Sequence, residues 1–305
     1  MSFFSLFGAL ELGLIFGLVA LGVLISFRLL NFPDLTVDGS FTLGAATTAT
    51  LIASGMPAII TSAIAILVGA AAGSLTAWLH VRLKIVDLLA SILVMIALYS
   101  INLRIMGRPN VPLIFEPTLF SNINLFGIPD YMLRPAMLFV VVIIIKLLLD
   151  WFFTTQLGLA ILASGANQRM ASAQGIATGK MTIIGLAVSN ALVAAAGSFY
   201  AQTQGGADIS MGVGTIVAGL AAVIIGETLF HVRRLIALTA AVIFGAILYR
   251  LFVALALNSN VLGIQAQDLN LITAFIIVIA LILPNLKKKI LARSQQSHGQ
   301  SNAEN

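Results

Sequence analysis

The chain has 305 residues, of which 60% are apolar and 9% are charged, and its formal net charge is +5. Globular domains usually carry about a quarter of charged residues, so this composition excludes a soluble fold and predicts a multi-pass protein of a lipid bilayer. The absence of cysteine excludes disulfides, thiolate metal sites and a cysteine nucleophile.

Apolar runs separated by Pro, Gly and charged residues predict the helices, and the composition can supply about eight to ten spans. In chain order the runs cover residues 8–30, 40–56, 57–79, 85–106, 135–154, 180–204, 210–229, 232–257 and 269–286. Runs 40–56 and 210–229 are short for a hydrocarbon core about 30 Å thick, so each is expected to be a broken or re-entrant helix. The predicted fold class is all-α, a polytopic membrane helix bundle with a transmembrane permease domain over 1–289 and a polar cytoplasmic tail over 290–305.

Lys and Arg in the short loops set the expected orientation. The cytoplasmic side is expected to hold the basic connections, which are 80–84, 169–180, 231–234 and 287–289. The periplasmic side then holds the less basic ones, at 107–134, 205–209 and 258–268. This places the N-terminus outside and the C-terminus inside, in a bacterial inner membrane. Because the positive charge is spread over loops instead of one face, no nucleic-acid partner is expected.

Two segments share the same spacing of polar and small residues. Residues 38–44 read DGSFTLG and residues 208–214 read DISMGVG, each with Ser two positions and Gly six positions after the Asp. Each opens one of the short runs, and an odd number of spans separates them, as in transporters built from inverted repeats whose broken helices meet at the substrate path. We therefore predict an inverted internal repeat with Asp38, Ser40, Asp208 and Ser210 on the substrate pathway. The alternative is that these residues cap the helices that follow.

Asn190 and Gln204 extend the predicted pathway along run 180–204. At 100° per residue the two side chains lie about 40° apart, so they share one stripe of a helix. The alternative role is hydrogen bonding between helices.

Charged residues in the apolar runs have structural explanations. Lys146 and Asp150 lie four residues apart, one helical turn, and are expected to pair with each other. The others fall near predicted helix ends, where capping or snorkelling accommodates them, and they are Glu11, Arg28, Asp87 and Glu227.

The segment between runs 135–154 and 180–204 is longer than a turn requires. Its small and polar residues, followed by one amphipathic turn, suit docking into a groove on a cytoplasmic partner, although a surface helix with no partner has the same pattern. The residues expected at such a contact are Ser164, Gly165, Asn167, Gln168, Arg169, Ala171 and Gly175.

The sequence shows no means of hydrolysing a nucleotide. The segment GIATGKMT at 175–182 has the wrong glycine spacing for a phosphate loop. No pairing of carboxylate, His or Ser groups suggests catalysis, so the chain is not expected to be an enzyme or to hold a cofactor. Energy for active transport then comes from another subunit or from an ion gradient.

Three segments resemble a known family. They read RLLNFPDLTVDGSFTLGAA at 28–46, ASGANQRMASAQGI at 163–176 and GVGTIVAGLAAVIIGE at 212–227. The chain resembles, over essentially its whole length, permeases of the branched-chain amino-acid type of ABC importer, and more closely the single-permease systems for tryptophan- and tyrosine-like substrates.

The resemblance implies a set of partners and a direction. It implies two copies of the permease around a central path, a dimer of cytoplasmic ATPases that binds the ATP and grips 163–176, and a periplasmic or lipoprotein binding protein that delivers the cargo. The expected function is import of a small amino-acid-like solute by alternating access.

Other functions stay open from the sequence. A secondary carrier or channel would use an ion gradient and would not copurify with an ATPase. A sugar-type ABC permease would carry pentoses. An intramembrane enzyme would need clustered catalytic groups, and the sequence shows only scattered polar residues.

Overall fold

The computed structural model describes residues 3–121, 130–230, 234–258 and 278. The elements in chain order are α1 (Phe3–Val23), the π-helical turn η1 (Leu24–Leu29), α2 (Thr36–Ala53), α3 (Ala58–Leu83), α4 (Asp87–Met106), β1 (Asn110–Pro112), α5 (Asp130–Thr154), α6 (Gln156–Ala166), α7 (Gln168–Ala173), α8 (Thr178–Gln204), β2 (Gly206–Asp208), α9 (Thr215–Phe230) and α10 (Leu235–Asn258). Apart from the two three-residue strands, the regular structure of the described part is helical, which confirms the predicted helical class.

Six helices of the described part are long and apolar enough to cross a bilayer: α1 with η1, α3, α4, α5, α8 and α10. They match six of the predicted runs. The two short runs also form helices, α2 with 18 residues and α9 with 16. At 1.5 Å per residue these span about 27 and 24 Å, less than a hydrocarbon core of about 30 Å. The predicted run 269–286 lies outside the described residues except for residue 278.

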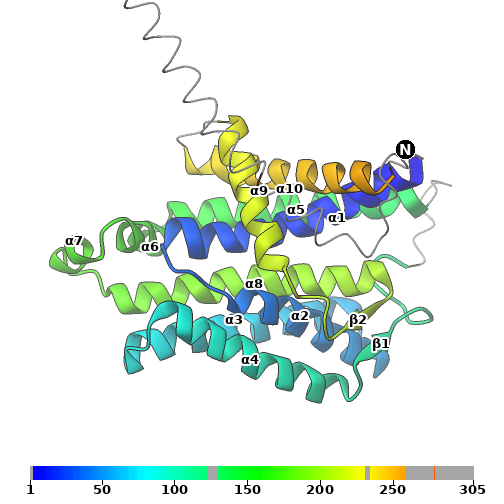
Figure 1. The fold of residues 1–305 in the computed structure, drawn as a ribbon, viewed down its shortest axis with the longest axis horizontal. Helices are drawn as coiled ribbons and strands as arrows, with labels where there is room; N and C mark the ends of the chain where they lie inside the picture. The colour runs from blue at the N-terminus through cyan, green and yellow to red at the C-terminus, as the bar shows by residue number, and fades with distance from the viewer. Residues whose placement is uncertain (1–2, 122–129, 231–233, 259–277, 279–305) are drawn as a thin grey trace, which may run out of the picture.

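Helix α8 lies at the centre and packs against α3, α2 and α1, while α1 also packs against α10, α5 and α9. In Figure 1 the long helices run side by side, whereas α9 crosses them. One end of the bundle, which we name the α7 end, carries α6, α7 and η1. The other, the β-sheet end, carries β1, β2 and the N-terminal end of α1 (Figure 1).

The two strands join the ends of α4 and α8. They pair antiparallel, with Asn110 opposite Asp208 and Pro112 opposite Gly206. The long connection after α4 therefore begins with a short sheet, which the sequence did not predict. Helix α5 begins at Asp130, five residues before the predicted start at 135.

Small residues let the helices approach closely. A Cβ added at Gly69 or Gly73 of α3 would overlap α8, and one added at Gly13 or Gly17 of α1 would meet Ile247 or Ile243 of α10. Without a hydrophobic driving force between helices in lipid, such close contacts contribute much of the packing. These glycines thus serve contacts within the chain.

Lys146, Asp150 and Glu11 are charged residues that lie inside the bundle. Lys146 and Asp150 form the predicted ion pair within α5, and Thr239 of α10 donates a hydrogen bond of 2.7 Å to Asp150. Glu11 differs from the prediction, because α1 begins at Phe3 instead of residue 8. It therefore lies two turns inside the helix, with only 9% of its surface exposed.

Candidate functional site

Asp38 joins the two short helices. It lies in the first turn of α2, and its carboxylate oxygens accept hydrogen bonds from the backbone N–H groups of Gly214 at 3.1 Å and Ile216 at 2.8 Å, where α9 begins. The first N–H groups of a helix have no partner within it and favour a negative charge. Asp38 thus caps α9 and not the helix in which it lies, so the capping alternative holds in a form that the sequence did not predict.

Asp208 forms a local turn instead. Its carboxylate accepts hydrogen bonds from the Ser210 N–H at 2.9 Å and the Ser210 hydroxyl at 2.5 Å, and from the Asn110 amide at 3.3 Å across the sheet. These bonds, the Ser210 hydroxyl above all, hold the pKa of the Asp208 carboxyl below its usual value. Asp208 lies seven residues before α9 begins at Thr215, whereas Asp38 lies inside α2, so the two copies of the motif differ in backbone structure.

Ser40 lies inside α2, four residues after the helix begins. It is fully buried, and its hydroxyl has no hydrogen-bond partner among the described residues. Ser40 is therefore enclosed by protein, whereas Ser210 is exposed at the β-sheet end.

Asn190 and Gln204 both lie in α8 but differ in burial. Asn190 is fully buried in α8 and donates hydrogen bonds of 2.7 Å to the Asp34 carboxylate and 3.1 Å to the Leu186 carbonyl oxygen. Gln204, the last residue of α8, is exposed. Asn190 thus ties α8 to the α1–α2 connection, close to the alternative role predicted for it.

A second polar cluster connects three helices near the β-sheet end. Ser198 of α8 accepts a hydrogen bond from Thr48 of α2 at 2.8 Å and lies 3.0 Å from the Ser62 hydroxyl of α3. Gln202 donates to Ser62 at 2.9 Å and accepts from the Leu119 N–H at 3.1 Å. These bonds satisfy buried polar groups between α2, α3 and α8, which is a structural role.

The predicted coupling segment forms two consecutive helices, α6 and α7, instead of one turn. The Asn167 side chain accepts a hydrogen bond from the Met170 N–H at 3.1 Å and so caps α7. Gly175, with φ +82°, lies in the turn between α7 and α8. Figure 1 shows α7 projecting at one end of the bundle.

The residues of this segment face two ways. Exposed are Asn167, Gln168, Arg169 and Gly175. Ser164 and Ala171 are buried, and Gly165 is half-buried. The exposed group therefore offers a polar surface, while the buried group attaches the segment to the bundle.

A groove of about 600 Å³ lies beside α7. It is lined on one side by His80 near the end of α3, by Lys84 and by Asp87 at the start of α4, and on the other by Gln168 and Thr178. Two of the connections predicted to be cytoplasmic therefore lie at the same end of the bundle, as that orientation requires.

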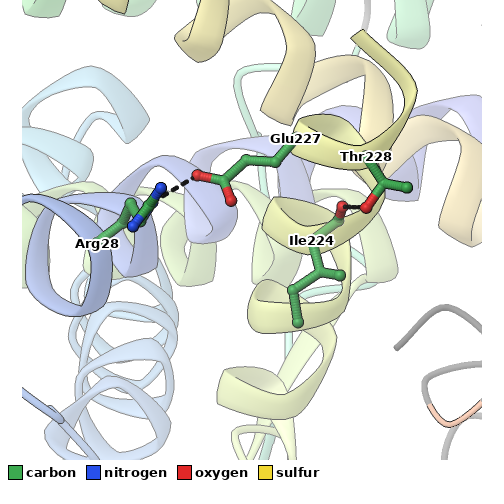
Figure 2. A network of polar contacts seen from close by, with 4 residues as sticks. All are labelled: Arg28, Ile224, Glu227 and Thr228. Atoms are coloured by element: carbon green, nitrogen blue, oxygen red, sulfur yellow. Dashed lines mark hydrogen bonds and ion pairs between the residues drawn. The ribbon is translucent and has the colours of Figure 1, made fainter. Parts of the chain in front are cut away.

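An ion pair joins η1 to the last turns of α9. Figure 2 shows Arg28 pointing toward Glu227, with 2.8 Å between Arg28 Nε and Glu227 Oε1. The side chains are 63% and 31% exposed, so water weakens the pair. Arg28 and Glu227 lie near helix ends as predicted. They form an ion pair with each other, however, although they are 199 residues apart in the sequence.

Asp34 is a residue that the sequence reasoning missed. It is fully buried in the α1–α2 connection, where its carboxylate accepts hydrogen bonds from the Thr36 N–H at 2.9 Å and from Asn190. A carboxylate two positions before a helix was a signal that could have found it. Within the described residues, no three His, Asp or Glu side chains gather into a metal site.

Comparisons with known proteins agree with this architecture. Residues 5–283 match the family described as branched-chain amino acid transport system, permease component. The chain is 41% identical over 273 residues to the tyrosine transport system permease protein of Clostridioides difficile (strain R20291), which covers 90% of this chain and 89% of that protein. It is 36% identical over 279 residues to an uncharacterized protein of Rickettsia prowazekii (strain Madrid E), covering 90% and 95%. No solved structure matches the chain.

Proposed function

Since the chain belongs to the permease family of branched-chain amino acid transport systems, we propose that its cargo is a tyrosine-like aromatic amino acid, moved into the cytoplasm. The chain is a multi-pass membrane permease of the ABC type and not an enzyme, and an ATPase and a binding protein are the partners that this membership implies. The observation that carries the choice of cargo is the 41% identity to a tyrosine transport permease, spread over 90% of the chain.

Helix α7 is the proposed contact with the ATPase, on the cytoplasmic side. Gln168 and Arg169 are exposed there, and the Asn167 cap fixes the start of the helix. Because Ala171 is buried against the bundle, a force on α7 is passed on to its neighbours. Closure of the ATPase dimer would thus move α7 and α6 together and switch the pathway between its two openings.

The assembly and the internal symmetry belong to the same proposal. Two copies of the chain are proposed to surround a central path, as the family resemblance implies. The order of the helices supports an inverted repeat. The short helix α2 is followed by two apolar segments, α3 and α4. The short helix α9 is likewise followed by two, α10 and the run 269–286. Asp38, Ser40, Asp208, Ser210, Asn190 and Gln204 remain the proposed polar groups near the path, at the positions described above.

Uptake by the reconstituted transporter tests the cargo. The permease, its ATPase and its binding protein are placed in proteoliposomes, and ATP-driven uptake of labelled tyrosine is measured with unlabelled competitors. Phenylalanine and tryptophan are expected to compete, while leucine competes weakly and a pentose does not. Competition by the pentose alone would favour a sugar permease, and uptake without ATP would favour a secondary carrier.

Two variants at the α7 end test the coupling. Gln168→Ala and Arg169→Ala are expected to lower uptake per ATP hydrolysed without changing thermal stability, because both side chains are exposed. Arg108→Ala, an exposed arginine beside the β-sheet, is the control and is expected to keep normal coupling. Normal coupling in both α7 variants would contradict the role of this helix.

The lack of cysteine makes the sidedness test direct. Gln168→Cys introduces a single thiol, and a membrane-impermeant maleimide is expected to label it only from the cytoplasmic side. Labelling from the periplasm of intact cells would place α7 outside and exclude contact with the ATPase.

A further inference from the structure

Asn31 has a backbone conformation that its side chain helps to explain. Its φ is +52°, in the left-handed region where glycine is favoured, and among the described residues only Lys84 shares this feature without being glycine. The Asn31 amide donates a hydrogen bond of 2.9 Å to the carbonyl oxygen of Gly165, 134 positions away. A glycine at position 31 would fit the backbone better but could not make this bond.

The α1–α2 connection and α6 also touch through their backbones. A Cβ added at Gly165 would overlap the carbonyl oxygen of Leu29, and Leu30 lies beside it. Because backbone lies directly against backbone here, a displacement of α6 would press on the end of η1 and on the connection. The Asn31–Gly165 hydrogen bond adds a second link at the same place.

The other side of the same connection reaches the centre of the bundle. Three residues after Asn31, the buried Asp34 binds the first N–H of α2 at 2.9 Å and the Asn190 side chain of α8 at 2.7 Å. Between them, the Phe32 ring packs edge-on against His80 of α3, with 5.3 Å between ring centroids. The connection is thus fixed to α2, α3 and α8.

We propose that Asn31 is a positioning residue that transmits motion of the coupling helices to the transmembrane helices. A displacement of α7 and α6 enters the connection at Gly165 and Asn31, and leaves through Asp34 into α2 and α8. The π-helical turn η1 follows α1 and lies directly before the connection, and it is the segment proposed to change its winding, since such turns are frequent at functional sites. This inference rests on the proposed role of α7 as the ATPase contact.

Two substitutions at position 31 separate the side-chain bond from the backbone conformation. Asn31→Gly keeps the left-handed conformation and removes the amide. Asn31→Asp keeps the size of the side chain but presents an oxygen to the Gly165 carbonyl oxygen. Ser54→Ala is the control, because it removes another exposed side-chain hydrogen bond, of 2.7 Å to the Leu51 carbonyl oxygen, far from α6.

The complete transporter in proteoliposomes gives the readout, as labelled tyrosine taken up per ATP hydrolysed. Both Asn31 variants are expected to hydrolyse ATP at the wild-type rate while uptake per ATP falls roughly two- to tenfold, the factor that corresponds to one neutral hydrogen bond. Ser54→Ala is expected to keep the wild-type ratio. Thermal stability of the three variants is expected to fall only slightly, because the lost bonds are exposed.

Two results would overturn the inference. One is a wild-type ratio in both Asn31 variants. The other is a parallel fall of uptake, ATP hydrolysis and thermal stability, which would assign Asn31 a purely structural role. Arg169→Ala, measured alongside, separates the two proposals. If Arg169→Ala uncouples ATP hydrolysis from uptake and the Asn31 variants do not, only the proposed role of Asn31 is wrong. Normal coupling in Arg169→Ala would contradict the proposed role of α7.

Discussion

Replacing Asp38 tests whether this residue holds α2 and α9 together or only lines the substrate pathway. Asp38→Ala removes two charge-assisted hydrogen bonds, of 3.1 Å to the Gly214 N–H and 2.8 Å to the Ile216 N–H. Each such bond contributes about 1.5–3 kcal/mol, and loss of a helix cap costs about 0.5–2 kcal/mol. Because the two bonds share one carboxylate and are not additive, we expect Asp38→Ala to lower the free energy of unfolding by about 2–4 kcal/mol.

The matched control is Asp208→Ala, at the equivalent position of the second motif copy. Asp208 binds Ser210 within its own turn and Asn110 across an exposed sheet, so its loss is expected to cost about 1 kcal/mol or less. Unfolding in SDS-containing mixed micelles, followed by the fluorescence of Trp78 and Trp151, measures both variants. The capping argument fails if the two variants lose equal stability, or if Asp38→Ala keeps full stability and still abolishes uptake.

Three further predictions use the same unfolding assay. Arg28→Gln is expected to cost less than about 1 kcal/mol, and the cost should shrink at high salt, because its ion pair with Glu227 is exposed. Lys146→Met is expected to cost about 3–5 kcal/mol, because it leaves Asp150 buried and without its ion-pair partner, whereas Lys146→Met with Asp150→Leu should recover most of that loss. The pKa of the Asp208 carboxyl is lower in the folded chain than in the unfolded chain. The carboxylate therefore stabilises the fold above its unfolded pKa, and this stabilisation is lost as the pH falls through the folded pKa. Asp208→Asn should thus reduce the acid sensitivity of unfolding below about pH 4.

The sequence predicted the long helices well because bilayer thickness sets their length. Runs 85–106 and 180–204 differ by two residues from the starts of α4 at Asp87 and α8 at Thr178, and they end where those helices end. The start of α2 was predicted four residues late, at 40. Its first turn, Thr36 to Gly39, contains polar residues that hydropathy does not count as membrane-inserted, and it is held by Asp34 and by the capping contact of Asp38.

The contacts of the candidate site could not be predicted in the same way. Asp38 and Ile216 are 178 positions apart, and Asn31 and Gly165 are 134 apart. The local sequence pattern predicts that a carboxylate near a helix start is a capping group. It does not predict which helix supplies the N–H groups that the carboxylate binds. The segment proposed for coupling was predicted to contain one amphipathic turn. Its division into two helices, α6 and α7, depends on the extended backbone of Asn167, with φ −157° and ψ 97°.

The repeated motif shows why equal spacing did not give equal structure. In the first copy, Gly44 lies within α2, and a Cβ there would overlap the carbonyl oxygen of Ala194, so the position needs glycine for close packing. In the second copy, Gly214 has open space around it and φ +83°, so that position needs glycine for its backbone conformation. Glycine is thus needed at position 44 for close packing and at position 214 for its backbone conformation. What relates the copies in the folded chain is a direct contact, because the Asp38 carboxylate binds the Gly214 N–H and fixes α9 against α2.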